Sequence, residues 1–274
     1  MCQIALNEDL AGDENTDITA ELITNETTAS ASLITREPGI LCGKAWVNKV
    51  FQLLGNEVTI KWMLDDGDPM IAGQEICTLN GNARQMLTGE RSAMNFLQTL
   101  SATATLTNLY VKTMNRSGCR LLDTRKTIPG MRFGQKYAVQ CGGGTNHRLG
   151  LSDAYLIKEN HIMSCGGIKK ALSKAIERHP NTLLEIEVEN IGELKQAIDG
   201  KAQVIMLDNF NNSDLSKAVE IRNVSNHQPK LEASGNVNLL TIANIAKTGV
   251  DYISVGALTK DVKAIDLSMR VHLE

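Results

Sequence analysis

Residues 183–208 read LLEIEVENIGELKQAIDGKAQVIMLD, a segment with the pattern of one βαβ unit. The periodicity predicts a strand at 183–189, a helix at 191–198 and a second strand at 203–208. Strand, helix and strand in this order favour two parallel strands covered by the helix between them.

The same alternation continues on both sides of this unit. We therefore expect an α/β protein in which parallel strands with outer helices form a closed or nearly closed TIM-like barrel. The other strands are expected at 119–123, 154–158, 230–234 and 252–256, and the other helices at 168–177, 214–223 and 239–247.

The first hundred residues have a different pattern, which is typical of an α+β sandwich domain. Strands are predicted at 29–35 and 57–64, and Asn82 is a suitable N-cap for a long helix that continues to Leu100. Alternating apolar and polar residues at 266–272 predict a final strand that pairs with this domain. The expected divisions are 1–103 for the N-terminal domain, 104–263 for the barrel and 264–274 for the returning segment.

Composition excludes several classes of partner. The net charge of -3 gives no broad basic field for nucleic acid, and no segment approaches the roughly 20 apolar residues that span a bilayer. The six cysteines form no Cys-x-x-Cys pair and are interpreted as reduced thiols. Since the N-terminus also lacks an apolar signal core, we expect a cytoplasmic protein without a nucleic-acid or membrane partner.

Six possible cations lie between residues 125 and 158 of this acidic chain. A solvated basic face is the alternative, but two of the cations directly follow predicted strands, and strand ends face the active-site rim of a barrel. Charge-assisted hydrogen bonds from this cluster suit a substrate with more than one carboxylate or phosphate group. The cluster consists of Arg125, Lys126, Arg132, His147, Arg148 and Lys158.

Acidic residues are expected at the same rim. Glu185, Glu187 and Glu189 share one face of the strand at 183–189, and they point inward or upward unless this is an exposed edge strand. Asp208 ends the next strand. Glu187 and Asp208 together could bind a diol or a hydrated metal ion.

Two glycine-containing loops follow the last two predicted strands. Barrels often bind a phosphate group in these loops, although each loop is also compatible with a simple turn. His161 and Cys165 are four residues apart, and we interpret them as structural residues rather than metal ligands. The two candidate phosphate loops are Ser234-Gly235-Asn236 and Gly256-Ala257.

Several motifs resemble the quinolinate phosphoribosyltransferase family, and the resemblance extends over essentially the whole chain. The matching segments include LDTRKTIPGMR at 122–132, CGGGTNHRLGL at 141–151, LIKENH at 156–161, EIEVE at 185–189, MLDN at 206–209, EASGN at 232–236 and TGVDYISVGALT at 248–259.

The resemblance implies that phosphoribosyl pyrophosphate and quinolinate react with Mg²⁺ as cofactor. The products would be nicotinate mononucleotide, pyrophosphate and CO₂, in NAD biosynthesis. It also implies a type II phosphoribosyltransferase fold, in which an N-terminal domain accompanies an open α/β barrel. The family forms homodimers, and a hexamer is the larger alternative.

By the same resemblance, a group of cations holds the two quinolinate carboxylates. Its members in this chain are Arg125, His147, Arg148 and Lys158. Arg91 would complete the site of the neighbouring subunit.

The phosphoribosyl side has its own residues by resemblance. Lys126 would face the pyrophosphate, and Glu187 and Asp208 would bind the ribose hydroxyls and Mg²⁺, so these three are the expected catalytic residues. The other expected substrate-binding positions are Thr124, Ser234, Gly235, Asn236, Gly256 and Ala257, of which the serine and the two glycines line the 5′-phosphate site.

Three other functions remain to be compared with this one. A Schiff-base aldolase could use Lys158, because neighbouring cations would lower the pKa of its amine. A related molybdenum-transport-associated protein shares the fold, but the intact Arg125-Lys126 and Asn146-His147-Arg148 argue against it. A non-enzymatic anion sensor would leave Glu187 and Asp208 without a role.

Overall fold

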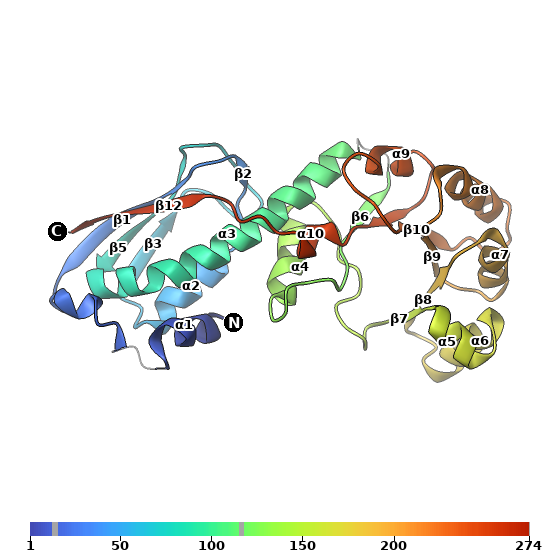
Figure 1. Cartoon of the computed structure of the whole chain (residues 1–274), viewed down its shortest axis with the longest axis horizontal. Helices are drawn as coiled ribbons and strands as arrows, with labels where there is room; N and C mark the ends of the chain where they lie inside the picture. The colour runs from blue at the N-terminus through green and yellow to red at the C-terminus, as the bar shows by residue number, and fades with distance from the viewer. Residues whose placement is uncertain (13–15, 115–117, 274) are drawn as a thin grey trace. The chain divides into compact units, whose positions relative to one another are not determined.

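The computed structural model describes residues 1–12, 16–114 and 118–273 (Figure 1). Their contacts divide the chain into a first unit of Met1–Asn108, Ile128–Gly143 and Asp261–Glu274 and a second unit of Leu109–Thr127 and Gly144–Lys260. By contacts, the first boundary follows Asn108, where the sequence prediction placed it after residue 103, and residues 128–143 group with the first unit. Ala138 in this segment packs in a buried cluster with Ile40 and Leu100.

The first unit contains a four-stranded antiparallel sheet in the order β12-β1-β5-β3. Ala29, Ala31 and Leu33 are buried on one face of β1, as the period of a half-buried strand requires. Ala31 lies opposite Val271, so the C-terminal run returns to this unit. The strands are β1 (Thr28–Thr35), β3 (Val58–Trp62), β5 (Glu75–Asn82) and β12 (Leu267–Leu273).

Smaller elements and three helices complete the first unit. Phe51 and Met86 are fully buried and belong to the same hydrophobic core as the sheet residues. The additional elements are α1 (Cys2–Leu10), the 3₁₀ helix η2 (Ala20–Leu22), β2 (Gly39–Ile40), α2 (Lys44–Leu53), β4 (Pro69–Met70) and α4 (Arg132–Cys141).

Helix α3 (Ala83–Thr113) is longer than the sequence indicated. Its predicted cap is present, since the side chain of Asn82 accepts a hydrogen bond of 3.1 Å from the backbone N–H of Gln85. The predicted end at Leu100 is wrong. Ser101, directly after this position, is fully buried, and its hydroxyl donates to the Cys42 carbonyl.

The second unit contains a six-stranded sheet in the order β6-β11-β10-β9-β8-β7, and each neighbouring pair is parallel. All six strands that the sequence predicted for the barrel are present. Among the described residues, β6 and β7 are the two edges of the sheet, so the barrel is open. The strands are β6 (Arg120–Leu122), β7 (Ala154–Ile157), β8 (Leu183–Val188), β9 (Val204–Asp208), β10 (Lys230–Ser234) and β11 (Tyr252–Ser254).

Helices alternate with these strands and cover the outside of the sheet (Figure 1). Helices α6 and α7 contact β8, α7 also contacts β9, and α9 contacts β11. The predicted helices are present, whereas α5 and α10 were not expected. The helices are α5 (Glu159–Cys165), α6 (Ile168–Arg178), α7 (Ile191–Asp199), α8 (Asn212–Asn223), α9 (Ile242–Ala246) and α10 (Ala257–Lys260).

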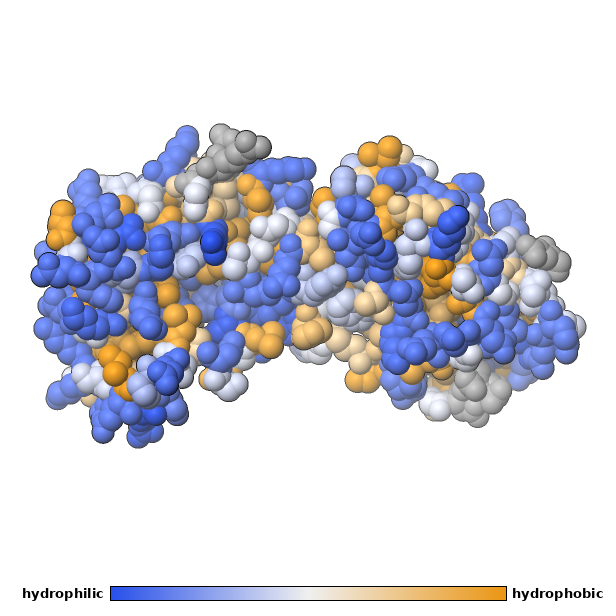
Figure 2. All heavy atoms as spheres, turned by 180° about the vertical axis from the view of Figure 1, so that it is seen from behind, coloured by the Kyte–Doolittle hydropathy of each residue, from blue (hydrophilic) through white to orange (hydrophobic). Residues whose placement is uncertain are grey.

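The surface is predominantly polar where Figure 2 shows it. Hydrophilic residues cover most of this face, and hydrophobic residues lie among them in small groups. In the described part of the chain, no helix combines the length and the apolar character that crossing a membrane requires.

Candidate active site

The carboxyl ends of the parallel strands bring the predicted polar residues to one edge of the sheet. Asp208 at the end of β9 lies opposite Ser234 at the end of β10. Glu187 of β8 pairs with Met206 of β9, and residues opposite each other in a sheet project from the same face. The strand ends of this unit therefore form the rim that the sequence predicted.

Lys158 and Glu187 form an ion pair at this rim. Lys158 Nζ lies 2.5 Å from Glu187 Oε2, with 48% of the lysine side chain and 15% of the glutamate side chain exposed. The resemblance assigned Lys158 to quinolinate and Glu187 to the ribose of phosphoribosyl pyrophosphate. The structure brings them together, and an incoming carboxylate would compete with Glu187 for the ammonium group.

Asp208 carries an unfavourable charge at the neighbouring strand end. Burial raises the pKa of its carboxyl and the negative charge of Glu187 raises it further, while Lys158, Asn209 and Lys126 act in the opposite direction. A cation near Glu187 and Asp208 would relieve this repulsion. Both side chains offer carboxylate oxygens, which Mg²⁺ prefers, so the residues fit the predicted metal.

Arg125 and Arg148 form a positive group in the same unit. Burial and the charge of Arg125 lower the pKa of Arg148, while Glu185 acts in the opposite direction. Arg148 Nη1 donates to the Ala154 carbonyl at 3.2 Å, which holds its guanidinium beside β7. Because the charge of Arg125 opposes that of the half-buried Arg148, the two side chains form a favourable environment for an anion.

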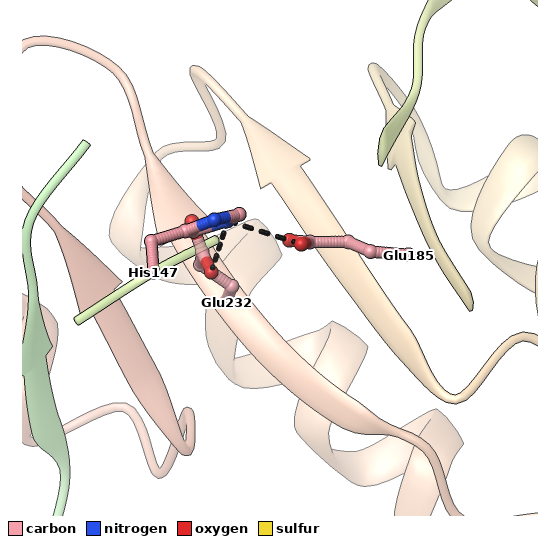
Figure 3. Close-up of side chains that lie close together, drawn as sticks. All are labelled: His147, Glu185 and Glu232. Atoms are coloured by element: carbon pink, nitrogen blue, oxygen red, sulfur yellow. Dashed lines mark ion pairs between the residues drawn. The ribbon is translucent and has the colours of Figure 1, made fainter. Parts of the chain in front are cut away.

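His147 contacts two buried glutamates from different strands (Figure 3). Its Nε2 lies 3.0 Å from Glu185 Oε2 and 3.6 Å from Glu232 Oε2. Only 3% and 1% of these glutamate side chains are exposed. Burial raises the pKa of Glu232 well above its usual range, and the charge of Glu185 adds to this effect.

Asp123 fixes the segment that carries His147. It is fully buried at the end of β6 and accepts hydrogen bonds from the His147 backbone N–H at 2.9 Å and from Asn146 Nδ2 at 2.5 Å. The loop after α4 is therefore tied directly to the sheet.

The loop after β10 has the geometry of a close backbone turn. Gly235 has a φ of +99°, and a Cβ at this position would lie 2.1 Å from Asn209 Oδ1. The Asn209 backbone N–H donates to the Ser234 carbonyl at 2.9 Å, and Asn236 Nδ2 donates to Asn209 Oδ1 at 3.3 Å. This close approach requires glycine at position 235.

The second predicted phosphate loop lies beside Lys126. The Lys126 backbone N–H donates to Thr124 Oγ1 at 3.0 Å, and its carbonyl accepts from Thr259 Oγ1 at 2.8 Å. A Cβ at Gly256 would lie 3.0 Å from Lys126 Cδ. Gly256 and Ala257, at the start of α10, therefore share one small region with Thr124 and Lys126.

Two of the predicted cations belong to the first unit. Arg91 is exposed on α3, and Arg132 begins α4. His161 Nδ1 accepts from the Lys158 backbone N–H at 3.0 Å, which confirms that His161 has a structural role at the start of α5.

Three residues that organise this edge were not selected as site residues from the sequence. They had one recognisable signal, since each is a polar residue within or directly after an apolar strand. A buried acid in such a position requires a polar partner. These residues are Asp123, Asn209 and Glu232.

The second unit is a parallel α/β barrel that carries arginines, paired carboxylates and two glycine loops. These features together define a class of enzyme that acts on small polyanionic substrates. The comparisons with known proteins identify the member of this class. The C-terminal domain of quinolinate phosphoribosyl transferase matches residues 103–270, and the N-terminal domain matches residues 17–101. The chain belongs to the quinolinate phosphoribosyltransferase family.

Individual relatives agree with this assignment. The chain is 39% identical to a probable nicotinate-nucleotide pyrophosphorylase (carboxylating) of Bacillus subtilis, over 94% of this chain and 88% of the relative. It is 38% identical to the corresponding Synechocystis protein, over 88% and 82%. The structure of the nicotinate-nucleotide pyrophosphorylase from Francisella tularensis matches with a TM-score of 0.93 and 50% identity, over 99% of this chain and 96% of that chain.

Proposed function

We propose that this protein transfers the phosphoribosyl group of phosphoribosyl pyrophosphate to quinolinate and releases CO₂, which forms nicotinate mononucleotide for NAD biosynthesis. Family membership along both domains supports the reaction. One structural observation supports this reaction most strongly. The barrel unit combines arginines that can bind carboxylates with an acidic pair and two glycine loops.

Quinolinate would be held through its two adjacent carboxylates. We assign this role to four residues of one subunit, which are Arg125, His147, Arg148 and Lys158. The planar guanidinium groups suit bidentate contacts with carboxylates, and Lys158 contributes a point charge. Binding of the dianion would offset the repulsion between the two arginines, which the lowered pKa of Arg148 reflects.

Phosphoribosyl pyrophosphate would occupy the opposite set of residues. Lys126 would face the pyrophosphate, and Glu187 and Asp208 would bind the ribose hydroxyls. The same two carboxylates would hold Mg²⁺, which would supply positive charge to the pyrophosphate leaving group. The 5′-phosphate and neighbouring groups would contact Thr124, Ser234, Gly235, Asn236, Gly256 and Ala257.

The reaction requires no covalent bond to the protein. The ring nitrogen of quinolinate attacks the ribose carbon C1 as the bond from C1 to the pyrophosphate oxygen breaks. Glu187 and Asp208 would stabilise the positive charge that develops on the ribose. The ring nitrogen is then cationic, so the adjacent carboxylate leaves as CO₂ and its electron pair takes up a proton at the ring carbon.

The Schiff-base alternative is disfavoured by the environment of Lys158. Lys158 Nζ contacts the Glu187 carboxylate at 2.5 Å, so this contact would have to break before the amine could attack a carbonyl group. Treatment with a carbonyl substrate and borohydride should therefore leave Lys158 unmodified.

We further propose a cytoplasmic homodimer in which Arg91 of each subunit completes the site of the other. Arg91 is exposed on α3 and therefore available to a second subunit. In such a dimer, the Arg91 guanidinium of one subunit would contact a substrate carboxylate in the site of the other subunit.

The proposed function is tested with purified protein, phosphoribosyl pyrophosphate, Mg²⁺ and either quinolinate or nicotinate. We expect nicotinate mononucleotide from quinolinate but not from nicotinate. R125A should lose at least about 100-fold in kcat/KM, since a charged contact with the substrate is removed. Turnover of nicotinate but not quinolinate would refute the dicarboxylate assignment.

A further inference from the structure

Asp123 lies at the point where the chain around His147 leaves the edge of the sheet. Just before this point, Thr145 forms a parallel bridge with Leu122 of β6. The Thr145 N–H donates to the Leu121 carbonyl at 2.8 Å, and its carbonyl accepts from the Asp123 N–H at 3.2 Å. The next bond of such a ladder would join the His147 N–H to the main-chain carbonyl of Asp123. The Asp123 carboxylate accepts this N–H instead, at 2.9 Å, and so holds the segment where the ladder ends.

Both oxygens of the Asp123 carboxylate bind this segment. Oδ1 accepts the His147 N–H, and Oδ2 accepts from Asn146 Nδ2 at 2.5 Å. The Asp123 side chain is fully buried, and a buried carboxylate depends on hydrogen bonds of this kind because its charge has lost the surrounding water. Asp123 therefore holds residues 145–148 and does not reach a substrate itself.

These hydrogen bonds connect the two parts of the proposed carboxylate site. Arg125 follows Asp123 by two residues, and Arg148 directly follows His147. Burial and the charge of Arg125 lower the pKa of Arg148, so the two arginines lie near each other. Arg148 Nη1 is also bound to the Ala154 carbonyl at 3.2 Å. The guanidinium of Arg148 is thus held at one end and its backbone at the other, and the backbone end depends on Asp123.

The spacing of the two arginines matters for a ligand with adjacent carboxylates. Carboxylates on neighbouring ring carbons are a fixed distance apart, and cations that are already held at a matching distance bind them without further ordering. A loop that is free to move would adapt equally well to carboxylates that are further apart. Rigid attachment of the loop therefore favours the adjacent arrangement.

We propose that Asp123 is a positioning residue that sets the spacing of the carboxylate-binding cations and thereby selects substrates whose two carboxylates are adjacent. This inference rests on the proposed function, which assigns the quinolinate carboxylates to the cations on both sides of Asp123. Asp123 acts through the main chain of residues 145–148 and touches no reacting atom.

An exchange of side chains tests this role. In D123N, Oδ1 can still accept the His147 N–H, but the new Nδ2 would face Asn146 Nδ2, and two donors form no hydrogen bond. In the exchanged variant D123N/N146D, the amide and the carboxylate change places, so both hydrogen bonds can form again.

D153N is the matched control from the same loop. Asp153 also accepts two backbone N–H groups, from Leu149 at 2.6 Å and from Gly150 at 2.9 Å, but it is exposed and follows Arg148. D153N should therefore bind dicarboxylates within about threefold of wild type.

The probes are phthalate and isophthalate, which differ only in whether the two carboxylates are adjacent, and calorimetry gives their Kd values. We expect D123N to weaken phthalate binding by about 10- to 100-fold, because a buried hydrogen bond is replaced by opposed donors, and to reduce the preference for phthalate over isophthalate. The KM for quinolinate should rise in parallel. The kcat and the KM for phosphoribosyl pyrophosphate should change less than about threefold, a difference that a general loss of structure would not produce.

The exchanged variant should recover phthalate binding to within about threefold of wild type. D123N with the wild-type preference for phthalate would overturn the inference, and so would an exchanged variant that binds no better than D123N. If D123N does not fold, the exchanged variant decides alone, because positioning requires that it fold and prefer phthalate. Wild-type protein that neither binds phthalate nor turns over quinolinate would refute the proposed function and this inference with it. An active wild type with an unaltered D123N refutes positioning alone.

Discussion

Gly235 shows how strongly one residue can constrain the proposed phosphate loop. We predict that G235A raises the KM for phosphoribosyl pyrophosphate by about tenfold or more, since the new Cβ would lie 2.1 Å from Asn209 Oδ1 and 3.0 Å from its backbone nitrogen. Steady-state kinetics measure this change. The positive φ alone should cost about 1–3 kcal/mol of stability.

Gly167 provides the control for backbone strain. Its φ is +114°, but a Cβ there would meet no atom within 4 Å. G167A should therefore lose a similar amount of stability, measured by urea unfolding, and keep its KM. Equal KM values for G235A and wild type would contradict the role of this loop in substrate binding.

At the residue scale, the sequence indicated where polar groups gather but not how they pair. The period of two placed Glu185 and Glu187 on one face of a strand, and this placement is consistent with their contacts in the structure. The pairing of Glu185 with His147 depends on a loop 38 positions earlier in the chain, and no local pattern specifies it.

Among the elements, β10 and β11 are joined by a charged network at their amino ends. Asp251 accepts from Arg222 Nη1 at 2.7 Å, Lys230 Nζ at 2.8 Å and the Leu231 N–H at 3.0 Å. We predict that D251N lowers the free energy of unfolding by about 1–3 kcal/mol at pH 7, because it weakens partly buried charged hydrogen bonds. D199N should cost much less, since Lys169 and Asp199 form an exposed pair at 3.5 Å.

The same network predicts the pH dependence of D251N. Burial tends to raise the pKa of Asp251, but the contacts with Lys230, Leu231 and Arg222 outweigh it and lower the pKa below its usual value of 3.8. An aspartate with a lowered pKa stabilises the folded state above its unfolded pKa, and this contribution disappears as pH falls through the folded pKa. The stability difference between wild type and D251N should therefore shrink below pH 3.8. A difference that grows on acidification would contradict this assignment.

Element prediction succeeded where periodicity was strong and failed where packing decides. The barrel strands alternate with amphipathic helices, and their order was readable from the sequence. Helix α3 continues beyond Leu100 because its small polar residues are buried against neighbours such as Cys42. Helix α4 was not predicted, and its buried residue Ala138 packs against Ile40 and Leu100, which are distant in the sequence.

For the whole molecule, the proposed exchange of Arg91 makes a prediction about mixed dimers. R91A and R148A should each be nearly inactive alone. Dissociated and reassociated together, they should recover up to about one quarter of wild-type activity, because half of the dimers are mixed and each has one complete site. Activity after mixing, with the oligomeric state measured by light scattering, tests this arrangement.

Two controls make the mixing experiment specific. R91A mixed with R91A should stay inactive, and so should R148A mixed with R125A, since both lack a cation of the same subunit's site. No recovery in the mixed R91A and R148A sample, despite mixed dimers, would show that Arg91 does not serve the neighbouring site.

The central claim concerns the reaction, and carboxyl labelling tests it most directly. Quinolinate carrying ¹³C in the carboxylate beside the ring nitrogen is incubated with the protein, phosphoribosyl pyrophosphate and Mg²⁺, and the gas and nucleotide are analysed by mass spectrometry. We predict labelled CO₂ in equal amount to unlabelled nicotinate mononucleotide. Label retained in the nucleotide would contradict the account, and so would the absence of any nucleotide product from correctly folded protein.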